Sequence, residues 1–491
     1  MPRPTILSAC LALAALVPIA VAAQSISVYQ TTPDLLETLS QRAALHFSAN
    51  AAAGVQLPVI NVDDAQRFQQ IDGFGASLTD AAAWLLAQKL TPAQTDAAFK
   101  SLFSRRDGIA ISFLRQPIGS SDLAVTFYSY DDLCTQTDKA CTTPAGASDP
   151  KLDHYSLQHD QEYILPLLEK AVHLNPSVHI MLTAWSPPGW MKTSGSMLGL
   201  YPNSKQPSTL RPDAYPAYAN YLVKTVLGYQ AAGVPVYSLS VVNEPLWPAP
   251  DYSGMLMPAN EQAAFIDTAL GPALATANLK TKIMVYDHNW DRPDYPETVL
   301  KDPKAYAFAA GTAWHHYAGD PSVMTKNHDE FPQKDQWVTE SSGGTWQKGN
   351  VLADEAAELI AVMRNWAKSY VLWALATDQN HGPHVGGCDT CRGLLTIDTS
   401  ATEGQPVRRE ADYYVLGQAS KFLLPGAVRI ASDEPAGTDL KDVAFRNPDG
   451  EIVLYALNAG TKSQDLRIVF HRKSAVTPVP AGSVATFTWK P

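Results

Sequence analysis

Short apolar runs and longer amphipathic stretches alternate along the middle of the chain, and this order constrains the fold more than any other feature. The runs that favour β-strands lie at 108–114, 178–183, 236–242, 282–286, 310–314, 336–339 and 370–373. Stretches with helical periodicity lie between them, at 163–173, 214–232, 260–276 and 354–368. Strands that alternate with helices in this way are expected to be parallel and joined by helical crossovers.

One further strand near Gly73 brings the expected strands to eight. Eight strand–helix repeats predict an α/β fold of the closed (β/α)8 type, a TIM barrel, in preference to an open doubly wound sheet. An open dinucleotide-binding sheet would also carry a Gly-x-Gly-x-x-Gly turn, which the sequence does not supply.

After about residue 406 the pattern changes to short β runs, at 428–430, 441–445, 452–457, 464–470 and 483–489. Turn sequences such as 447–450 separate them, which is typical of a small antiparallel β-domain. Two strand-like runs near the other end of the chain, at 25–29 and 59–62, could complete the same sheet. We therefore predict a catalytic barrel over 67–405 and a β side domain built from 24–66 and 406–491.

The first residues have the pattern of a cleaved secretory signal over 1–23. Arg3 precedes an apolar run from Ile6 to Ala23 that ends in small residues. A membrane anchor is the alternative, but the run is short and contains Pro18. We expect an exported protein, periplasmic or extracellular, without stable membrane insertion once the signal is removed.

Signal cleavage would remove Cys10 and leave Cys134, Cys141, Cys388 and Cys391. Three pairings are then possible, and the local ones, Cys134–Cys141 and Cys388–Cys391, are the simplest because each closes one short loop. An oxidising compartment favours disulfide bonds. A zinc site and a redox Cys-x-x-Cys pair are the alternatives.

The composition is that of a globular protein, with 46% hydrophobic and 17% charged residues. The net charge of −11 argues against a nucleic-acid partner, because phosphate binding requires clustered Lys and Arg. The charge says little else about partners, and the oligomeric state stays open.

Two glutamates directly follow expected strands, where the active sites of β/α barrels lie. Glu244 follows the run at 236–242, and Glu340 follows the run at 336–339. Either residue alone could be a solvated loop residue or a helix cap. Asn243 beside Glu244 could hydrogen-bond a sugar hydroxyl. Aromatic residues, whose faces stack on sugar rings, occur near the expected strand ends at Trp185, Trp190, Trp247, Trp314, Tyr317, Trp346 and Trp373.

Two carboxylates in a barrel mouth suit the hydrolysis of glycosidic bonds. One acid, with a raised pKa, protonates the leaving oxygen, and the other attacks the anomeric carbon to form a covalent glycosyl-enzyme that water then hydrolyses. This retaining, double-displacement route requires carboxyl groups about 5–5.5 Å apart. We expect Glu244 and Glu340 to form this pair.

Ordered motifs lie at 70–80, 114–122, 128–132, 184–192, 242–245, 314–317 and 339–342. In this combination the chain, from about residue 69 to residue 489, resembles glycoside hydrolase family 30, which includes glucosylceramidases and endo-β-1,6-glucanases. The resemblance implies a (β/α)8 barrel with an attached β-sandwich-like side domain formed by both chain ends. It implies no cofactor and no metal.

The resemblance also implies roles for single residues. Glu244 matches the acid/base catalyst, Glu340 the nucleophile, and Asn243 the neighbour that contacts the sugar 2-hydroxyl. The other candidate substrate-binding residues are Arg115, Asp122, Trp185, His315, Tyr317 and Trp373. A cation such as Arg115 near the nucleophile would keep that carboxylate ionised. Asp80 and Asp287 are expected to support the site without taking part in the chemistry.

The substrate within the family stays open between glucosylceramide, which would mean a role in sphingolipid metabolism, and β-1,6-glucan. His316 stands where glucosylceramidases usually carry Trp, and the stretch 386–393 is similar to a loop of the β-1,6-glucanase branch. β-Xylosidase or xylanase and β-fucosidase or galactosidase activities are alternatives. An inactive carbohydrate-binding protein on the same scaffold is the alternative from another class, and the presence of both glutamates argues against it.

Overall fold

The computed structural model describes residue 1 and residues 24–49, 56–134, 141–401 and 406–491. Residues 2–23 of the signal expected over 1–23 lie outside the described residues, as does Cys10. Among the residues described, no helix has the length and apolar character needed to cross a membrane.

Eight parallel strands close into a barrel, which confirms the fold predicted from the alternation. In chain order they are β4 (Gly73–Ser77), β5 (Phe113–Ile118), β6 (His179–Ala184), β7 (Ser238–Ser240), β8 (Lys282–Asn289), β9 (Ala309–His315), β10 (Asp335–Ser341) and β11 (Ala367–Leu372). Each strand pairs with the next, and β11 pairs with β4 to close the barrel. Its interior is filled by a buried layer of side chains that includes Phe113, Met181, Met284, Ala313, Trp337 and Val371.

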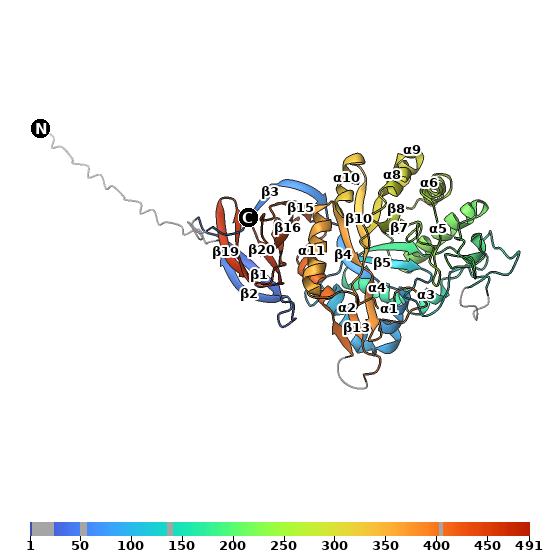
Figure 1. The fold of residues 1–491 in the computed structure, drawn as a ribbon, viewed down its shortest axis with the longest axis horizontal. Coiled ribbons are helices and arrows are strands. Elements are labelled where there is room, and N and C mark those ends of the chain that lie inside the picture. The colour runs from blue at the N-terminus through green and yellow to red at the C-terminus, as the bar shows by residue number, and fades with distance from the viewer. Residues whose placement is uncertain (2–23, 50–55, 135–140, 402–405) are drawn as a thin grey trace.

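Helices connect the barrel strands and pack around them (Figure 1). They are α1 (Asp80–Trp84), α2 (Pro92–Phe103), α3 (Gln158–Glu162), α4 (Ile164–Leu174), α5 (Tyr215–Ala231), α6 (Ala259–Phe265), α7 (Gly271–Thr276), α8 (Asp294–Lys301), α9 (Pro303–Phe308), α10 (Ser322–Glu330) and α11 (Val351–Arg364), with π-helical turns η1 (Leu85–Lys89) and η4 (Ile266–Leu270) and 3-10 turns η2 (Gly189–Met191) and η3 (Pro212–Ala214). The local sequence explains where several of these helices begin. α2, for example, begins with a reciprocal capping box between Thr91 and Gln94 and with Pro92 in its first turn.

Two predicted boundaries were wrong for local reasons. The strand predicted at 108–114 begins only at Phe113, because Ile109 and Ile111 bond to the end of α2 instead of to a strand. The N–H groups of Ile109 and Ile111 donate to the carbonyls of Ser101 and Leu102, each at 2.9 Å.

The helix predicted at 354–368 ends at Arg364. Trp366 has a φ of 72°, in the left-handed region, so the helix cannot continue through it. Strand β11 then starts at Ala367, within the range predicted to be helical.

Both chain ends form one nine-stranded sheet, as predicted for the side domain. The strands run in the order β19 (Lys473–Val479), β18 (Gln464–Phe470), β3 (Val59–Gln70), β15 (Val428–Ser432), β16 (Leu440–Arg446), β17 (Ile452–Asn458), β20 (Val484–Trp489), β1 (Ser25–Thr31) and β2 (Ser40–His46). In Figure 1 the blue strands β1 and β2 lie beside the red strands β19 and β20, at the end of the molecule away from most barrel helices. Side chains from both chain ends share one core, including Ile26, Ile60, Leu454, Ile468 and Phe487.

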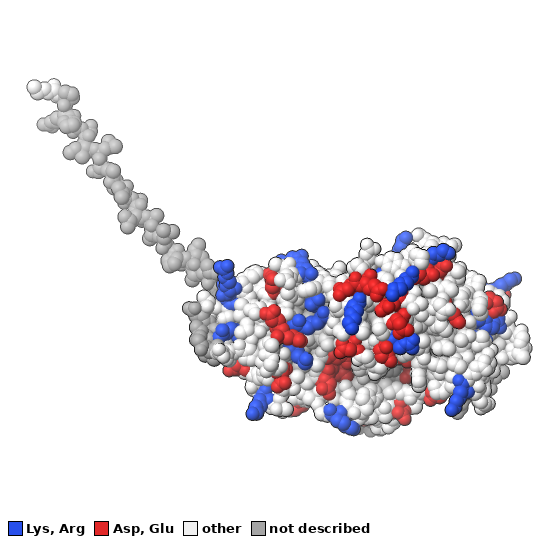
Figure 2. Space-filling view, turned by 45° about the horizontal axis from the view of Figure 1, so that its top comes forward, with Lys and Arg blue, Asp and Glu red and all other residues white. Residues whose placement is uncertain are grey.

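Helix α12 (Ala411–Ser420) lies between the barrel and the sheet, where it contacts β4, β13 and β20. A small third sheet of β12 (Ala374–Asp378), β13 (Gly393–Ile397) and β14 (Val407–Arg409) precedes it in the chain. On the face drawn in Figure 2, Lys and Arg are interspersed with Asp and Glu and do not gather into one basic patch.

Candidate active site

The candidate residues meet at one mouth of the barrel, because parallel strands present all their carboxyl ends on one side. Arg115 lies in β5, Glu244 follows β7, His315 ends β9, and Glu340 lies near the end of β10. A cleft of about 550 Å³ opens at this mouth. Its lining residues are Asp122, Glu244, Trp247, Pro250, Asp251, Tyr252, Tyr317, Glu340, Trp346, Trp373, Gly387, Cys388 and Cys391.

Glu244 and Glu340 are brought together although 96 positions separate them in the chain (340 − 244). One carboxylate oxygen of each, together with a ring nitrogen of His315, lie within 4.8 Å of one another. Glu244 has a φ of 46°, an uncommon left-handed conformation for a residue with a side chain, and its N–H donates to the carbonyl of Asp287 at 3.0 Å. The turn after β7 therefore holds this carboxylate over the barrel mouth.

Arg115 is fully buried, and its guanidinium group bonds to three side chains of the site, two carboxylates and one amide. It donates to Oε2 of Glu340 at 2.5 Å, to Oδ1 of Asn243 at 2.7 Å and to Oδ2 of Asp287 at 2.9 Å. Its guanidinium carbon lies 4.7 Å from the centre of the Trp185 ring. Because the guanidinium group is a rigid fork, these bonds fix the positions of its partners relative to one another.

His315 is also fully buried and lies between two carboxylates. Nδ1 is 3.1 Å from Oε1 of Glu244, and Nε2 is 3.1 Å from Oδ1 of Asp287. Burial alone would lower the pKa of His315, but the charge of Glu340 and the bonds to Asp287 and Glu244 raise it to about 9. His315 is therefore a cation at neutral pH, and both of its ring nitrogens donate.

This cation corrects one expectation, namely that the pKa of the acid residue is raised. Burial does raise the pKa of Glu244, but the hydrogen bond from His315 and the nearby positive charges outweigh it, so the pKa of Glu244 lies below its usual value. The nearest proton to the carboxylate of Glu244 in this network is on Nδ1 of His315, 3.1 Å from Oε1.

Asp287 and Asp80 bond to residues and segments that form the site, in the supporting role expected from the sequence. Asp287 is fully buried and accepts further hydrogen bonds from Ser240 at 2.7 Å and Thr339 at 2.6 Å. Burial opposes its ionisation, but Arg115 and His315 hold its pKa far below the usual range. Asp80 accepts from the N–H of Val125 at 2.7 Å and so anchors the loop that carries Asp122.

Four of the seven predicted aromatic residues line the cleft, namely Trp247, Tyr317, Trp346 and Trp373. The hydroxyl of Tyr317 donates to Oε1 of Glu340 at 2.8 Å. Trp185 is buried beneath, and its ring stacks on that of Trp373 with 5.0 Å between the ring centres.

The other two aromatic residues, Trp190 and Trp314, were wrongly expected at the rim. Both are buried in the main core. Their indole N–H groups are satisfied inside it, by Oδ2 of Asp131 at 2.9 Å and by Oε1 of Gln336 at 2.8 Å respectively.

Both local disulfide bonds, Cys134–Cys141 and Cys388–Cys391, are present. The second forms part of the cleft wall beside Asp122, where the N–H of Cys388 points at Oδ2 of Asp122 at 3.4 Å. Burial, together with repulsion from the charge of Glu340, raises the pKa of Asp122 to about 7. The loop that carries this disulfide bond approaches Asp122 closely, because a Cβ added at Gly387 would lie 2.6 Å from the Cβ of Asp122.

His316, which stands where glucosylceramidases usually carry Trp, is not among the described residues that line the cleft. Its Nδ1 is 2.7 Å from Oε2 of Glu358, and its Nε2 accepts from the N–H of Ser342 at 3.1 Å. Adjacent residues of an extended segment point to opposite sides, so His315 faces the barrel mouth and His316 faces away from it.

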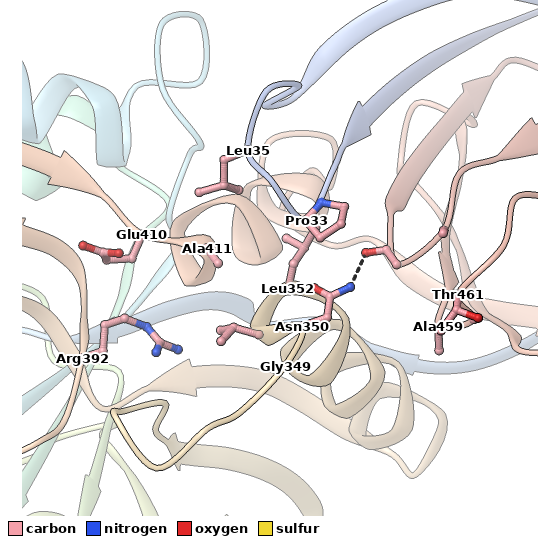
Figure 3. Close-up of a pocket in the computed structure, with 14 residues that line it drawn as sticks. Pro33, Leu35, Gly349, Asn350, Leu352, Arg392, Glu410, Ala411, Ala459 and Thr461 are labelled. Carbon is pink, nitrogen blue, oxygen red and sulfur yellow. Dashed lines mark hydrogen bonds between the residues drawn. The ribbon is translucent and has the colours of Figure 1, made fainter.

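A second hollow, of about 520 Å³, lies at the seam between the barrel and the side domain (Figure 3). There the side-chain amide of Asn350 donates to the carbonyl of Gly482 at 2.9 Å. Its charged residues are Arg392 and Glu410, and Arg392 is already paired with Asp412. The described residues that line this hollow include a single carboxylate, Glu410, so the candidate site is the cleft, where two carboxylates face each other.

A parallel eight-stranded barrel with two adjacent carboxylates and an aromatic-lined cleft at its carboxyl end defines a β/α-barrel glycoside hydrolase. The comparison with family models agrees, and the chain belongs to glycosyl hydrolase family 30. The TIM-barrel domain of that family matches residues 71–423, and its β-sandwich domain matches residues 426–487.

Relatives of two activities match over most of the chain. The endo-1,6-β-D-glucanase of Neurospora crassa is 35% identical over 404 residues, which cover 79% of this chain and 79% of that protein. The lysosomal acid glucosylceramidase of Mus musculus is 27% identical over 456 residues, 88% of this chain and 83% of that protein. Among solved structures, the endo-β1,6-glucanase BT3312 has a TM-score of 0.83 and 30% identity and covers 95% of this chain and 99% of its own.

Proposed function

We propose that the protein is an exported endo-β-1,6-glucanase that cleaves its substrate with retention of configuration. The observation that carries the retaining mechanism is the approach of Glu244 and Glu340, whose nearest oxygens lie within 4.8 Å. This fits the roughly 5–5.5 Å between the carboxyl groups of retaining enzymes and leaves no room for the attacking water that inverting enzymes place between carboxyls about 6.5–9.5 Å apart.

In the proposed reaction Glu340 attacks the anomeric carbon while the bond to the leaving oxygen breaks. Arg115 and Tyr317 both donate to Glu340, so they hold its carboxylate in one orientation. Glu244 delivers the proton to the leaving oxygen after receiving it from Nδ1 of His315, 3.1 Å away. When the covalent bond forms, Glu340 loses the negative charge that raises the pKa of His315 most.

In the second half-reaction a water molecule attacks the anomeric carbon while Glu244 accepts a proton from that water. Glu340 leaves as a carboxylate, and the sugar is released with its original configuration. Asn243, held by Arg115 at 2.7 Å, is placed to bind the 2-hydroxyl of the sugar that is cleaved. Asp122 and Trp373 form the wall around that sugar, and Trp185 supports Trp373 from beneath by stacking on its ring.

The lining of the cleft favours a glucan over a lipid. Trp247 and Trp346 are about half exposed, at 53% and 49%, and offer flat faces to further sugar rings. No Leu, Ile, Val or Met side chain of the described residues lines the cleft, whereas a ceramide tail would require aliphatic surface. The resemblance to endo-1,6-β-glucanases of 30–35% identity supports the same choice.

Export is supported by the sequence pattern at 1–23 and by the two disulfide bonds, which persist in oxidising compartments. The destination, periplasm or exterior, would follow from fractionating the cells that make the protein.

The decisive experiment compares three substrates at equal enzyme concentration: linear β-1,6-glucan, linear β-1,3-glucan and glucosylceramide in detergent micelles. We expect short β-1,6-linked oligosaccharides from the first and at least 100-fold slower cleavage of the others. Proton NMR of the first products should show the β-anomer before mutarotation. Release of ceramide as the fastest reaction would reject the glucanase assignment, and the α-anomer as first product would reject retention.

A further inference from the structure

A second cluster of ionisable side chains lies outside the cleft, in the long segment between β5 and α3. One carboxylate oxygen of Asp131, one of Asp149 and a ring nitrogen of His154 lie within 4.8 Å of one another. These residues take no part in the glycosidase site described above.

The carboxylate of Asp131 is fully buried and only partly satisfied. Oδ2 accepts from the indole of Trp190 at 2.9 Å, whereas Oδ1 has no hydrogen-bond partner among the residues that the structure describes. A buried carboxylate oxygen without a donor is costly and therefore uncommon in native proteins.

Asp149 is only 5% exposed and brings a second carboxylate to the same place. Its Oδ2 accepts from the N–H of His154 at 2.7 Å and lies 2.9 Å from Nδ1 of that residue. The imidazole of His154 is itself largely exposed, with a side-chain accessibility of 66%. Two buried carboxylates therefore face one solvent-exposed imidazole, and Oδ1 of Asp131 is left without a donor among the described residues.

We propose that Asp131, Asp149 and His154 bind a divalent cation of the zinc or manganese class. Zn²⁺ accepts carboxylate oxygen and imidazole nitrogen at about 2.0–2.2 Å, and three protein ligands with a water complete its tetrahedral shell. The exposure of His154 leaves that fourth position open to solvent. Binding requires a neutral imidazole, so His154 releases its proton when the ion enters.

The bound ion would stabilise the wall of the glycosidase cleft without touching substrate. Asp131 is bonded to Trp190, which lies in the segment after β6, and that segment also carries Trp185. The segment that holds Asp131 begins after β5 and carries Asp122. A cation on Asp131 and Asp149 therefore fixes the segment after β5 and, through the bond from Trp190 to Asp131, steadies its contact with the segment after β6, so it raises thermal stability while leaving kcat unchanged.

The test uses the full mature protein, dialysed against EDTA and then against metal-free buffer at pH 7. Isothermal titration with ZnCl₂, MnCl₂ and CaCl₂ should show one Zn²⁺ or Mn²⁺ bound per chain, and thermal melts should show a higher Tm with that ion. Asp131→Asn and Asp149→Asn should each weaken binding at least 100-fold. The matched control is Asp153→Asn, an exposed acid in the same segment, which should bind like the wild type.

Several results would overturn the proposal. They are the absence of binding for all three ions, binding that Asp131→Asn leaves intact, and a preference for Ca²⁺ that His154→Gln does not change. Because Asp131→Asn could also unfold the protein, His154→Gln at the exposed ligand provides a second variant and should weaken Zn²⁺ binding at least tenfold. Binding lost in Glu340→Gln but kept in Asp149→Asn would assign the ion to the glycosidase cleft and reject this site.

Discussion

Nε2 of His315 lies 3.1 Å from Oδ1 of Asp287, and both side chains are completely buried. The other ring nitrogen of His315 lies 3.1 Å from Oε1 of Glu244, so His315 links the two carboxylates. In the proposed mechanism His315 supplies the proton to Glu244, and its charge state should govern both stability and activity at alkaline pH.

Stability should fall as the pH rises from about 6.5 to about 9. The pKa of His315 is raised in the folded protein to about 9, against about 6.5 in the unfolded chain. The stabilisation is therefore complete below about pH 6.5 and is lost as the pH passes through the folded value, with a total on the order of 3 kcal/mol.

Urea denaturation at pH 6 and pH 9.5 measures this effect. The free-energy difference between the wild type and His315→Gln should be large at pH 6 and small at pH 9.5. His46→Gln, at an exposed position, is the control and should show no such change. A difference that is equal at both pH values would show that His315 is neutral in the folded protein.

The roles of the two glutamates are separated by azide rescue. Glu340→Gly should lose nearly all turnover on an aryl β-glucoside and regain it with azide, giving the glycosyl azide of inverted configuration, because azide occupies the place of the nucleophile. Glu244→Gly should lose about 10²–10⁴-fold on substrates with poor leaving groups and give the azide of retained configuration. If the two products are exchanged between the variants, the assignment of acid/base and nucleophile is reversed.

Asp122 should control sugar binding in a pH-dependent way. Its pKa of about 7 means that the carboxyl is protonated in acid and becomes a full acceptor only above neutrality. KM for a glucoside should therefore fall as the pH rises through about 7. Asp122→Asn should remove this dependence and weaken binding by about 1.5–3 kcal/mol, the usual size of a hydrogen bond to a charged group. An unchanged KM profile in the variant would place Asp122 outside the sugar contacts.

Trp247 and Trp346 should act on long substrates only. Trp346→Ala should lower kcat/KM for β-1,6-oligosaccharides by roughly 1 kcal/mol or more per lost stacking contact, about fivefold. Cleavage of an aryl glucoside, which extends little beyond the cleaved sugar, should change less than twofold. Trp84→Ala, at a tryptophan on helix α1 away from the cleft lining, is the comparison variant. Equal losses on short and long substrates would mean that Trp346 shapes the site itself.

Much of the architecture follows from local pattern. Alternating apolar runs and helical stretches predict a closed barrel because a parallel sheet requires crossovers, and strand-end position predicts where Glu244 and Glu340 lie. Local patterns failed where a residue finds a partner in another element. Ile109 and Ile111 look like strand residues but bond to the end of α2, and Trp190 and Trp314 look like rim residues but find buried acceptors.

The sequence by itself determined the kind of protein through the order of its strands and the two glutamates, and it favoured the local cysteine pairs and a sheet shared by both chain ends. Only the tertiary structure decided how the site is charged. Asp287, His315 and Arg115 come from three different strands, and their pKa values depend on burial and on carboxylates that lie nearby only after the barrel closes. For the same reason only the structure reveals that the proton is held by His315 and that Asp131, Asp149 and His154 converge.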